Sequence, residues 1–274
     1  MSSFFSNKTV LVTGGSSGIG LAFARHVIKL GATAVLVARR ASVLEEARKA
    51  LLAETSVPAA RVEILALDVS AEEDVTREVT ALMARLPIDI LVNNAGVVLP
   101  GRFLDLAPAE FRRMMDINYF GAVHMCRIIL PQMIARGRGH VLNVSSLAGV
   151  IGIYGYTPYA ASKFALSGFS QALRAEMWPH GVRVSVCLPP DTDTPQLAFE
   201  NQHKPAETRA IAGAVKTLSA DQVAVAMARG LERNDYEIYP DIASRVSALA
   251  QGVVPGVVRW FCDGAQRKVK VQTS

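Results

Sequence analysis

Short, nearly continuous runs of Val, Ile, Leu and Ala alternate along this chain with longer stretches whose apolar residues recur at helical spacing. Continuous apolar runs are typical of strands that helices cover on both faces of a sheet. The runs predict strands at 8–13, 34–38, 62–67, 88–92, 140–144 and 183–188. Helical patterns lie between them, the longest at 109–136 and 158–178.

Repeated strand–helix–strand units predict an α/β fold with one doubly wound parallel sheet and helices on both faces. The length of 274 residues suits a single domain of this kind. We expect residues 1–240 to form that domain and residues 241–274 to form an apolar and basic extension. A polar, proline-punctuated segment at about 190–215 follows a strand end, where ligands bind in such sheets, so we expect a substrate lid. The alternative is a passive surface loop.

A glycine-rich turn joins the first predicted strand to the first helix. Glycines let a backbone turn tightly and approach a pyrophosphate, and the helix start presents free N–H groups to the anion. This context predicts a Rossmann-like dinucleotide site, since a glycine-rich turn outside it would be weak evidence. The residues expected at the phosphates are Gly14, Ser16, Ser17, Gly18, Ile19 and Gly20.

The end of the second predicted strand indicates which dinucleotide is bound. An acid that holds the ribose hydroxyls is typical of NAD sites, but this chain has Arg39 and Arg40 there. A guanidinium pairs well with a 2′-phosphate, so the sequence favours NADPH, with Arg39 as the expected contact. Asp68, after the third strand, can accept a hydrogen bond from adenine or can cap the following helix.

Residues suited to proton transfer follow in the second half of the chain. Tyr159 and Lys163 are four residues apart, which places both on one helix face. We expect the Lys163 ammonium to lower the pKa of the Tyr159 phenol and make it a useful acid. Ser146 can hydrogen-bond a substrate carbonyl, and Asn118 can hold a water that links Lys163 to solvent.

These motifs together resemble the short-chain dehydrogenase/reductase family. The matching features, in the order of that family, are Thr13-Gly14-x-x-x-Gly18-x-Gly20, Asn93-Asn94-Ala95-Gly96, Asn118, Ser146 and Tyr159-x-x-x-Lys163. The resemblance implies a nicotinamide-dependent oxidoreductase with Asn118, Ser146, Tyr159 and Lys163 as its catalytic residues. It further implies cofactor contacts from Val69, Asn94, Ala95, Gly96, Tyr159, Lys163 and Pro189.

The segment after the sixth strand departs from most of that family, because Pro189-Pro190 replaces the usual Pro-Gly. From Pro189 to about Arg209 it resembles 3-ketodihydrosphingosine reductases, which implies NADPH-dependent reduction of 3-ketosphinganine to sphinganine. Asp191 or Asp193 would then pair with the substrate ammonium, unless both are turn carboxylates. Other interpretations are the same chemistry on a steroid, a 3-oxoacyl thioester or a small ketone, and a non-catalytic NADPH-binding protein.

Composition and charge limit the kinds of ligand and partner that we expect this protein to bind. The net charge of +5 is modest and its Lys and Arg are dispersed, so we expect a lipid-like ketone and no nucleic acid. The three cysteines and five histidines lack metal-ligand spacing, so we expect no metal. With no evident signal peptide or membrane-spanning run, we expect a cytoplasmic homo-oligomer. The C-terminal segment is apolar and basic, with Trp260, Phe261 and Arg267. It either contacts a membrane surface or packs against the domain or a second subunit.

Overall fold

Seven parallel strands form one sheet in the computed structural model, which describes residues 4–212 and 216–272. Their spatial order is β3-β2-β1-β4-β5-β6-β9, so the order reverses between β1 and β4. The strands are β1 (Thr9–Thr13), β2 (Thr33–Ala38), β3 (Val62–Ala66), β4 (Ile90–Asn93), β5 (Gly139–Val144), β6 (Val182–Cys187) and β9 (Glu237–Ile238).

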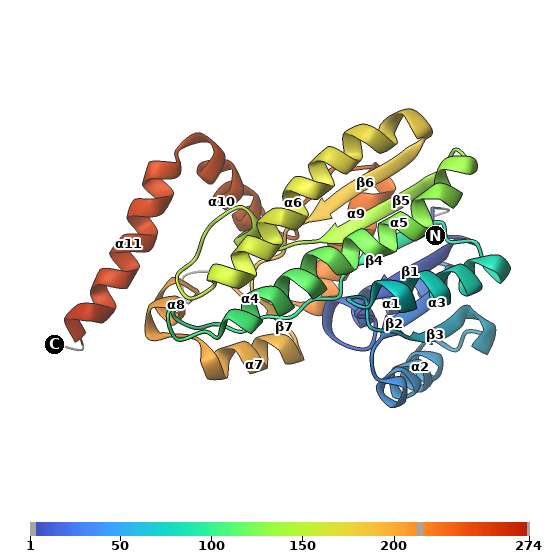
Figure 1. Ribbon diagram of the computed structural model, residues 1–274, viewed down its shortest axis with the longest axis horizontal. Helices are drawn as coiled ribbons and strands as arrows, with labels where there is room; N and C mark the ends of the chain where they lie inside the picture. The colour runs from blue at the N-terminus through green and yellow to red at the C-terminus, as the bar shows by residue number, and fades with distance from the viewer. Residues whose placement is uncertain (1–3, 213–215, 273–274) are drawn as a thin grey trace.

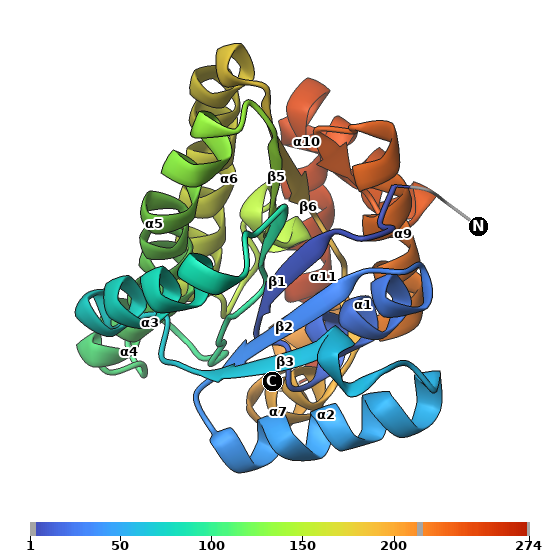
Figure 2. The ribbon, with the colours of Figure 1, turned by 90° about the vertical axis from the view of Figure 1, so that its right-hand side faces the viewer.

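Helices cover both faces of this sheet (Figure 2). On one face lie α1 (Gly18–Lys29), α2 (Ala41–Thr55) and α9 (Ala220–Arg233). On the other lie α3 (Glu72–Arg85), α5 (Gly121–Ala135) and α6 (Thr157–Met177), with α4 (Pro108–Met115) running into α5 through a π-helical turn at Asp116–Phe120. The predicted α/β fold with a doubly wound parallel sheet is therefore confirmed.

Successive side chains along each strand pack into two hydrophobic cores, one on each face of the sheet. In β1, Val10 and Val12 pack with α1 and α9, whereas Leu11 packs with the helices of the opposite face. All three side chains are fully buried, because successive side chains of a strand point to opposite faces and both faces are covered. This double burial explains why the strands appear as uninterrupted apolar runs.

The lid segment, defined as residues 190–212, differs from the predicted loop because it contains helix. The short strand β7 (Thr192–Asp193) pairs with β8 (Leu218–Ser219), and α7 (Pro195–His203) and α8 (Ala206–Ala212) follow β7. Helix α7 begins where the Thr194 hydroxyl accepts a hydrogen bond from the Leu197 N–H, at 3.2 Å, with Pro195 in the first turn. Residues 213–215 of the expected lid lie outside the described residues.

The chain ends in two further helices, α10 (Ile242–Val253) and α11 (Pro255–Gln272), which come after the last sheet strand. Helix α11 extends away from the sheet and packs against α8 of the lid segment (Figure 1). Across the described ranges, none of the helices is both long enough and apolar enough to cross a bilayer.

Candidate active site

The glycine-rich turn lies at the carboxyl end of β1, beside the point where the strand order reverses. Gly14 has a φ of +64°, and the Gly15 N–H donates to the Val37 carbonyl at 3.1 Å. The Asn94 side-chain amide donates to the Thr13 and Gly14 carbonyls at 3.0 and 3.3 Å. These bonds fix the turn against two neighbouring strands.

This turn leaves no room for larger side chains. A Cβ on Gly20 would lie 2.5 Å from both the Gly14 carbonyl oxygen and Asn94 Nδ2. In the described chain no side chain caps the start of α1, so the first N–H groups of that helix are available to an anion. Ser16, Ser17 and Ile19 face the adjoining cavity. The turn therefore fits the pyrophosphate of a dinucleotide.

Other predicted cofactor residues surround this turn at strand ends. Arg39 is exposed immediately after β2, the strand next to β1, and so lies beside the turn. Asp68 Oδ1 accepts hydrogen bonds from the Ser70 N–H at 3.0 Å and the Ser70 hydroxyl at 2.6 Å. These bonds lie before α3, whose N-cap is Ala71, so Asp68 does not cap that helix. Val69 packs closely against Gly121, and its carbonyl bonds to His124 Nδ1 at 3.0 Å.

Ser146, Tyr159 and Lys163 converge on the same cavity from the end of β5 and from α6. The Ser146 oxygen accepts a hydrogen bond from the Ala148 N–H at 3.1 Å, and the Ser146 side chain also hydrogen-bonds with Tyr159. Lys163 is buried in α6, and Tyr159 on the same helix is half-buried. Lys163 Nζ donates to the Val144 carbonyl at 2.8 Å and lies 5.8 Å from the centroid of the Tyr159 ring.

The predicted effect of Lys163 on Tyr159 is wrong for this structure. Burial raises the pKa of the Tyr159 phenol, the negative charge of Glu200 raises it further, and a hydrogen bond with Ser146 lowers it. Burial lowers the pKa of Lys163 to about 8. The ammonium bonds to a backbone carbonyl instead of the phenol, so desolvation dominates both groups.

Asn118 is buried in the π-helical turn between α4 and α5. Its amide group donates to the Val97 carbonyl and to the Ser162 hydroxyl, both at 2.9 Å, and Oδ1 accepts from the Val97 N–H at 2.8 Å. A Cβ on Gly96 would lie 3.4 Å from Asn118 Oδ1 and 3.5 Å from Lys163 Nζ. Gly96 thus lies between Asn118 Oδ1 and Lys163 Nζ, and the relay through Asn118 stays a prediction.

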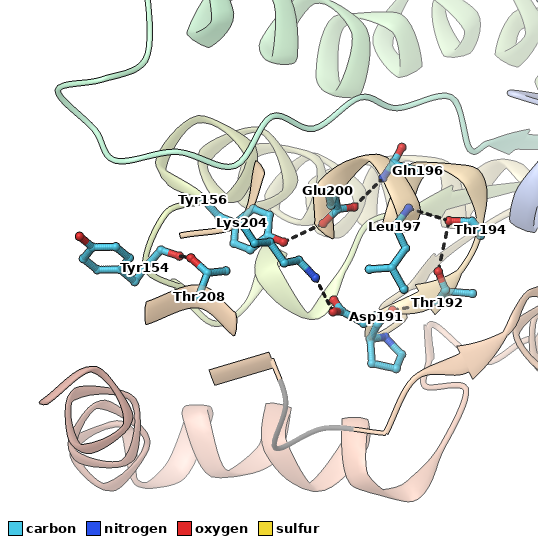
Figure 3. A network of polar contacts seen from close by, with 11 residues as sticks. Tyr154, Tyr156, Asp191, Thr192, Thr194, Gln196, Leu197, Glu200, Lys204 and Thr208 are labelled. Carbon is cyan, nitrogen blue, oxygen red and sulfur yellow. Dashed lines mark hydrogen bonds and ion pairs between the residues drawn. The ribbon is translucent and has the colours of Figure 1, made fainter. Parts of the chain in front are cut away.

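The lid segment lines the other end of the cavity. Figure 3 shows its polar contacts. Asp191 lines the cavity and pairs at 2.7 Å with Lys204, whose side chain is buried. Asp193 is exposed on β7 and is not among the described residues that line the cavity. The structure therefore brings one of the two predicted substrate acids into the site and leaves the other outside.

Glu200 is the acid that sequence reasoning missed. It lies on α7 with 8% of its surface exposed, and its Oε2 accepts a 2.7 Å hydrogen bond from the Tyr156 hydroxyl. The helical position of Glu200 was hidden because the segment was expected to be a loop. The Thr194-Pro195 helix start was the signal for this helix.

One cavity joins the glycine turn to the lid. The residues predicted for cofactor, chemistry or substrate that line it are Gly14, Ser16, Ser17, Gly18, Ile19, Asn94, Gly96, Ser146, Tyr159, Lys163, Pro189 and Asp191. Gly20, Ala95 and Asn118 lie behind this surface. Gly20 and Asn118 support it, and Ala95 donates its N–H to Thr13 Oγ1 at 3.0 Å. Among the described side chains, no three His, Cys, Asp or Glu residues gather to hold a metal ion.

Comparisons with known proteins agree with this geometry. A family model described as "short chain dehydrogenase" matches residues 8–205. A 3-ketodihydrosphingosine reductase of Bos taurus is 39% identical over 267 residues, covering 95% of this chain and 79% of that protein.

Solved structures give the same result. A levodione reductase superimposes with a TM-score of 0.79 at 30% identity, covering 86% of this chain and 97% of that one. A short-chain dehydrogenase of Sphingobium yanoikuyae in complex with NADPH has a TM-score of 0.77 at 28% identity, covering 92% and 95%.

Proposed function

Because the chain belongs to the short-chain dehydrogenase/reductase family and is an oxidoreductase of ketone or alcohol groups that uses a nicotinamide cofactor, we propose that it reduces 3-ketosphinganine to sphinganine with NADPH. The observation that carries this proposal is the continuous cavity, which runs from the glycine turn past Ser146 and Tyr159 to the acids of the lid. Ile153, Leu197 and Ile211 give it apolar surface for a hydrocarbon chain. The named relative acts on this substrate.

When bound, the nicotinamide cofactor supplies the hydride that adds to the carbonyl carbon. The Ser146 hydroxyl donates a hydrogen bond to the carbonyl oxygen and stabilises the negative charge that develops there. Tyr159 donates its proton to the same oxygen. A raised pKa keeps the phenol protonated near neutral pH, and an alkoxide is a strong enough base to remove that proton.

Replacement of this proton requires a path away from the substrate. Lys163 lies behind Tyr159 in α6, and Asn118 adjoins Lys163 on the side of Gly96. A lysine whose pKa is about 8 can release and regain a proton near neutral pH. We therefore assign Lys163 and Asn118 to proton return, in addition to any contact that Lys163 makes with the cofactor.

Cofactor preference rests on Arg39. An exposed guanidinium beside the phosphate-binding turn can make paired, charge-assisted hydrogen bonds to a 2′-phosphate. The experiment that tests the whole proposal compares purified protein on 3-ketosphinganine, a steroid ketone and a 3-oxoacyl thioester, each with NADPH and with NADH. The proposal requires the highest kcat/KM for 3-ketosphinganine with NADPH, and a higher value for another ketone refutes it.

Residues 241–274 form, in our proposal, a separate extension that lies on a lipid surface at the cytoplasmic face of a membrane. Apolar side chains at Ile242, Val246, Leu249 and Val253 are spaced to one side of α10, and each is more than half exposed. Helix α11 adds Trp260, 74% exposed, among exposed arginines. Aromatic and basic side chains beside an apolar stripe suit a membrane interface and an enzyme whose substrate is a lipid.

Co-sedimentation with anionic liposomes tests this surface. The double variant Val253→Ser/Trp260→Ser should reduce the bound fraction several-fold, whereas Phe103→Ser, which removes an exposed ring outside the extension, should not. Equal binding by the wild type and the double variant contradicts the membrane proposal. A change of oligomeric state in that variant instead identifies the face as a contact between subunits of the expected homo-oligomer.

A further inference from the structure

The substrate end of the cavity holds an excess of negative charge. Asp191 and Glu200 both line it, and Lys204 pairs with Asp191 at 2.7 Å (Figure 3). Two carboxylates and one ammonium leave one negative charge unbalanced in this group. Lys163 is the one cation among the described residues that line the cavity, and its Nζ donates to the Val144 carbonyl. Lys204 makes its ion pair with Asp191, so Glu200 has no ion pair among the described residues.

The Glu200 carboxylate has two neutral hydrogen-bond partners. The Tyr156 hydroxyl donates to Oε2 at 2.7 Å, and the Gln196 side-chain amide donates to Oε1 at 3.4 Å. Burial raises the pKa of Glu200 more than any other cause, and the nearby charges act in opposite directions, since Lys204 lowers it and Asp191 raises it. A buried carboxylate in this state is stabilised strongly by a cationic ligand.

Glu200 is also connected to the proton donor Tyr159, through the side chain of Tyr156. The Tyr156 and Tyr159 rings lie with their centroids 5.6 Å apart, and the hydroxyl of Tyr156 points to Glu200. A ketone bound at Tyr159 that carries an ammonium on the adjacent carbon would direct this ammonium toward the acids. Asp191 is already paired with Lys204, so it attracts a second cation less strongly than Glu200 does.

We propose that Glu200 binds the ammonium group next to the substrate ketone and so makes the enzyme prefer 2-amino ketones over ketones that lack the amine. This inference rests on the proposed function and adds the residue that determines specificity. It assigns to α7 of the lid the role expected from Asp191 or Asp193. The apolar residues of the same cavity then receive the hydrocarbon chain.

Glu200 also connects substrate recognition to proton transfer. Its negative charge is one of the causes that raise the pKa of Tyr159. An ammonium bound to Glu200 neutralises that charge, so the pKa of the phenol falls when a 2-amino ketone enters the site. An amino ketone should therefore have a higher kcat and a lower KM than the same long-chain ketone without the amino group.

Kinetics of Glu200→Gln on two substrates tests the inference: 3-ketosphinganine and the same long-chain ketone without its amino group. We expect kcat/KM to fall about 30-fold for the amino ketone and less than about 3-fold for the other, since one charged hydrogen bond is lost with the first substrate alone. Glu73→Gln removes an exposed carboxylate from α3 and serves as the matched control, with unchanged kinetics.

Any other result of these kinetic measurements contradicts the role proposed for Glu200. Equal losses on both ketones would mean that Glu200 only supports the lid, and full activity of Glu200→Gln on the amino ketone would refute the assignment. If the wild type reduces both ketones equally well, the inference fails while the proposed reaction stands. If it reduces neither, the proposed function fails, and the inference fails with it.

Discussion

The cofactor half of the site, residues before Pro189, and the lid segment hold their polar side chains in different ways. In the cofactor half the partners are mainly backbone groups, as in the bonds of Asn94 to Thr13 and Gly14 and of Lys163 to Val144. In the lid segment the two buried carboxylates have side-chain partners from remote parts of the chain. Glu200 bonds to Tyr156, and Glu207 pairs with Arg102 at 3.3 Å.

From this difference we expect one half to perform the chemistry common to all ketones and the other to select the substrate. Backbone groups at strand ends are fixed by the sheet, so the site they position accommodates the same cofactor whatever the ketone. Side-chain pairs can be exchanged without disturbing the sheet, and α7 and α8 depend on such pairs. We therefore expect variants in the cofactor half to lower activity on all ketones, and lid variants to discriminate among them.

The largest expected effect is that of Tyr159→Phe. Loss of the proton donor should lower kcat about 1,000-fold on every ketone, while NADPH binding changes little, because the ring remains in place. Consumption of NADPH measures the first quantity and quenching of protein fluorescence by NADPH measures the second. A variant that keeps a tenth of the wild-type rate would contradict the assigned role, and so would one that loses activity on a single ketone.

Arg39→Ser should alter cofactor preference without altering ketone preference. Loss of the guanidinium removes paired, charge-assisted contacts to the 2′-phosphate, so KM for NADPH should rise about 30-fold and KM for NADH should stay near its wild-type value. Arg40→Ser is the matched control, since Arg40 is equally exposed at the start of α2. If the two variants behave alike, Arg39 is not the contact.

Gly20→Ala tests how rigid the turn is. The new methyl group would meet the Gly14 carbonyl and Asn94 Nδ2 at 2.5 Å, so we expect a loss of about 1–3 kcal/mol in stability and weaker binding of NADPH. Gly168→Ala in α6, where nothing lies within 4 Å of the new methyl group, should leave NADPH binding unchanged and raise stability by up to about 1 kcal/mol, because alanine favours a helix interior more than glycine does. Thermal unfolding with and without NADPH measures these effects, and an unaffected Gly20→Ala would mean that the turn adapts.

Asp191→Asn should produce the smallest effect, and mainly on stability. Lys204 is buried and would lose its ionic partner, but Asp191 is one-third exposed, so we expect about 1–2 kcal/mol. Adding Lys204→Met to Asp191→Asn should restore part of this loss, as denaturant unfolding can measure. If Asp191→Asn instead lowers kcat/KM more than Glu200→Gln does, Asp191 is the residue that binds the ammonium.

Spacing along the chain predicted several residues that the structure brings together in the candidate site. The glycine turn, Ser146, Tyr159 and Lys163 were all predicted, and the structure gathers them around one cavity. The predicted strands agree with the observed ones to within two residues at each end, but β9 was not foreseen, because two residues make no apolar run. The protonation of Tyr159 was misjudged, since burial and the charge of Glu200 depend on segments far from it in sequence.

The sequence by itself determined the parallel sheet and the helices between its strands, because strand ends and helix spacing are local properties that place side chains directly. Only the tertiary structure decided which acid of the cavity is buried without an ion pair. Asp191 lies just before β7 and pairs with Lys204, whereas α7 brings Glu200 to the Tyr156 hydroxyl. Burial and charge balance arise from contacts between distant segments, so spacing along the chain does not reveal them.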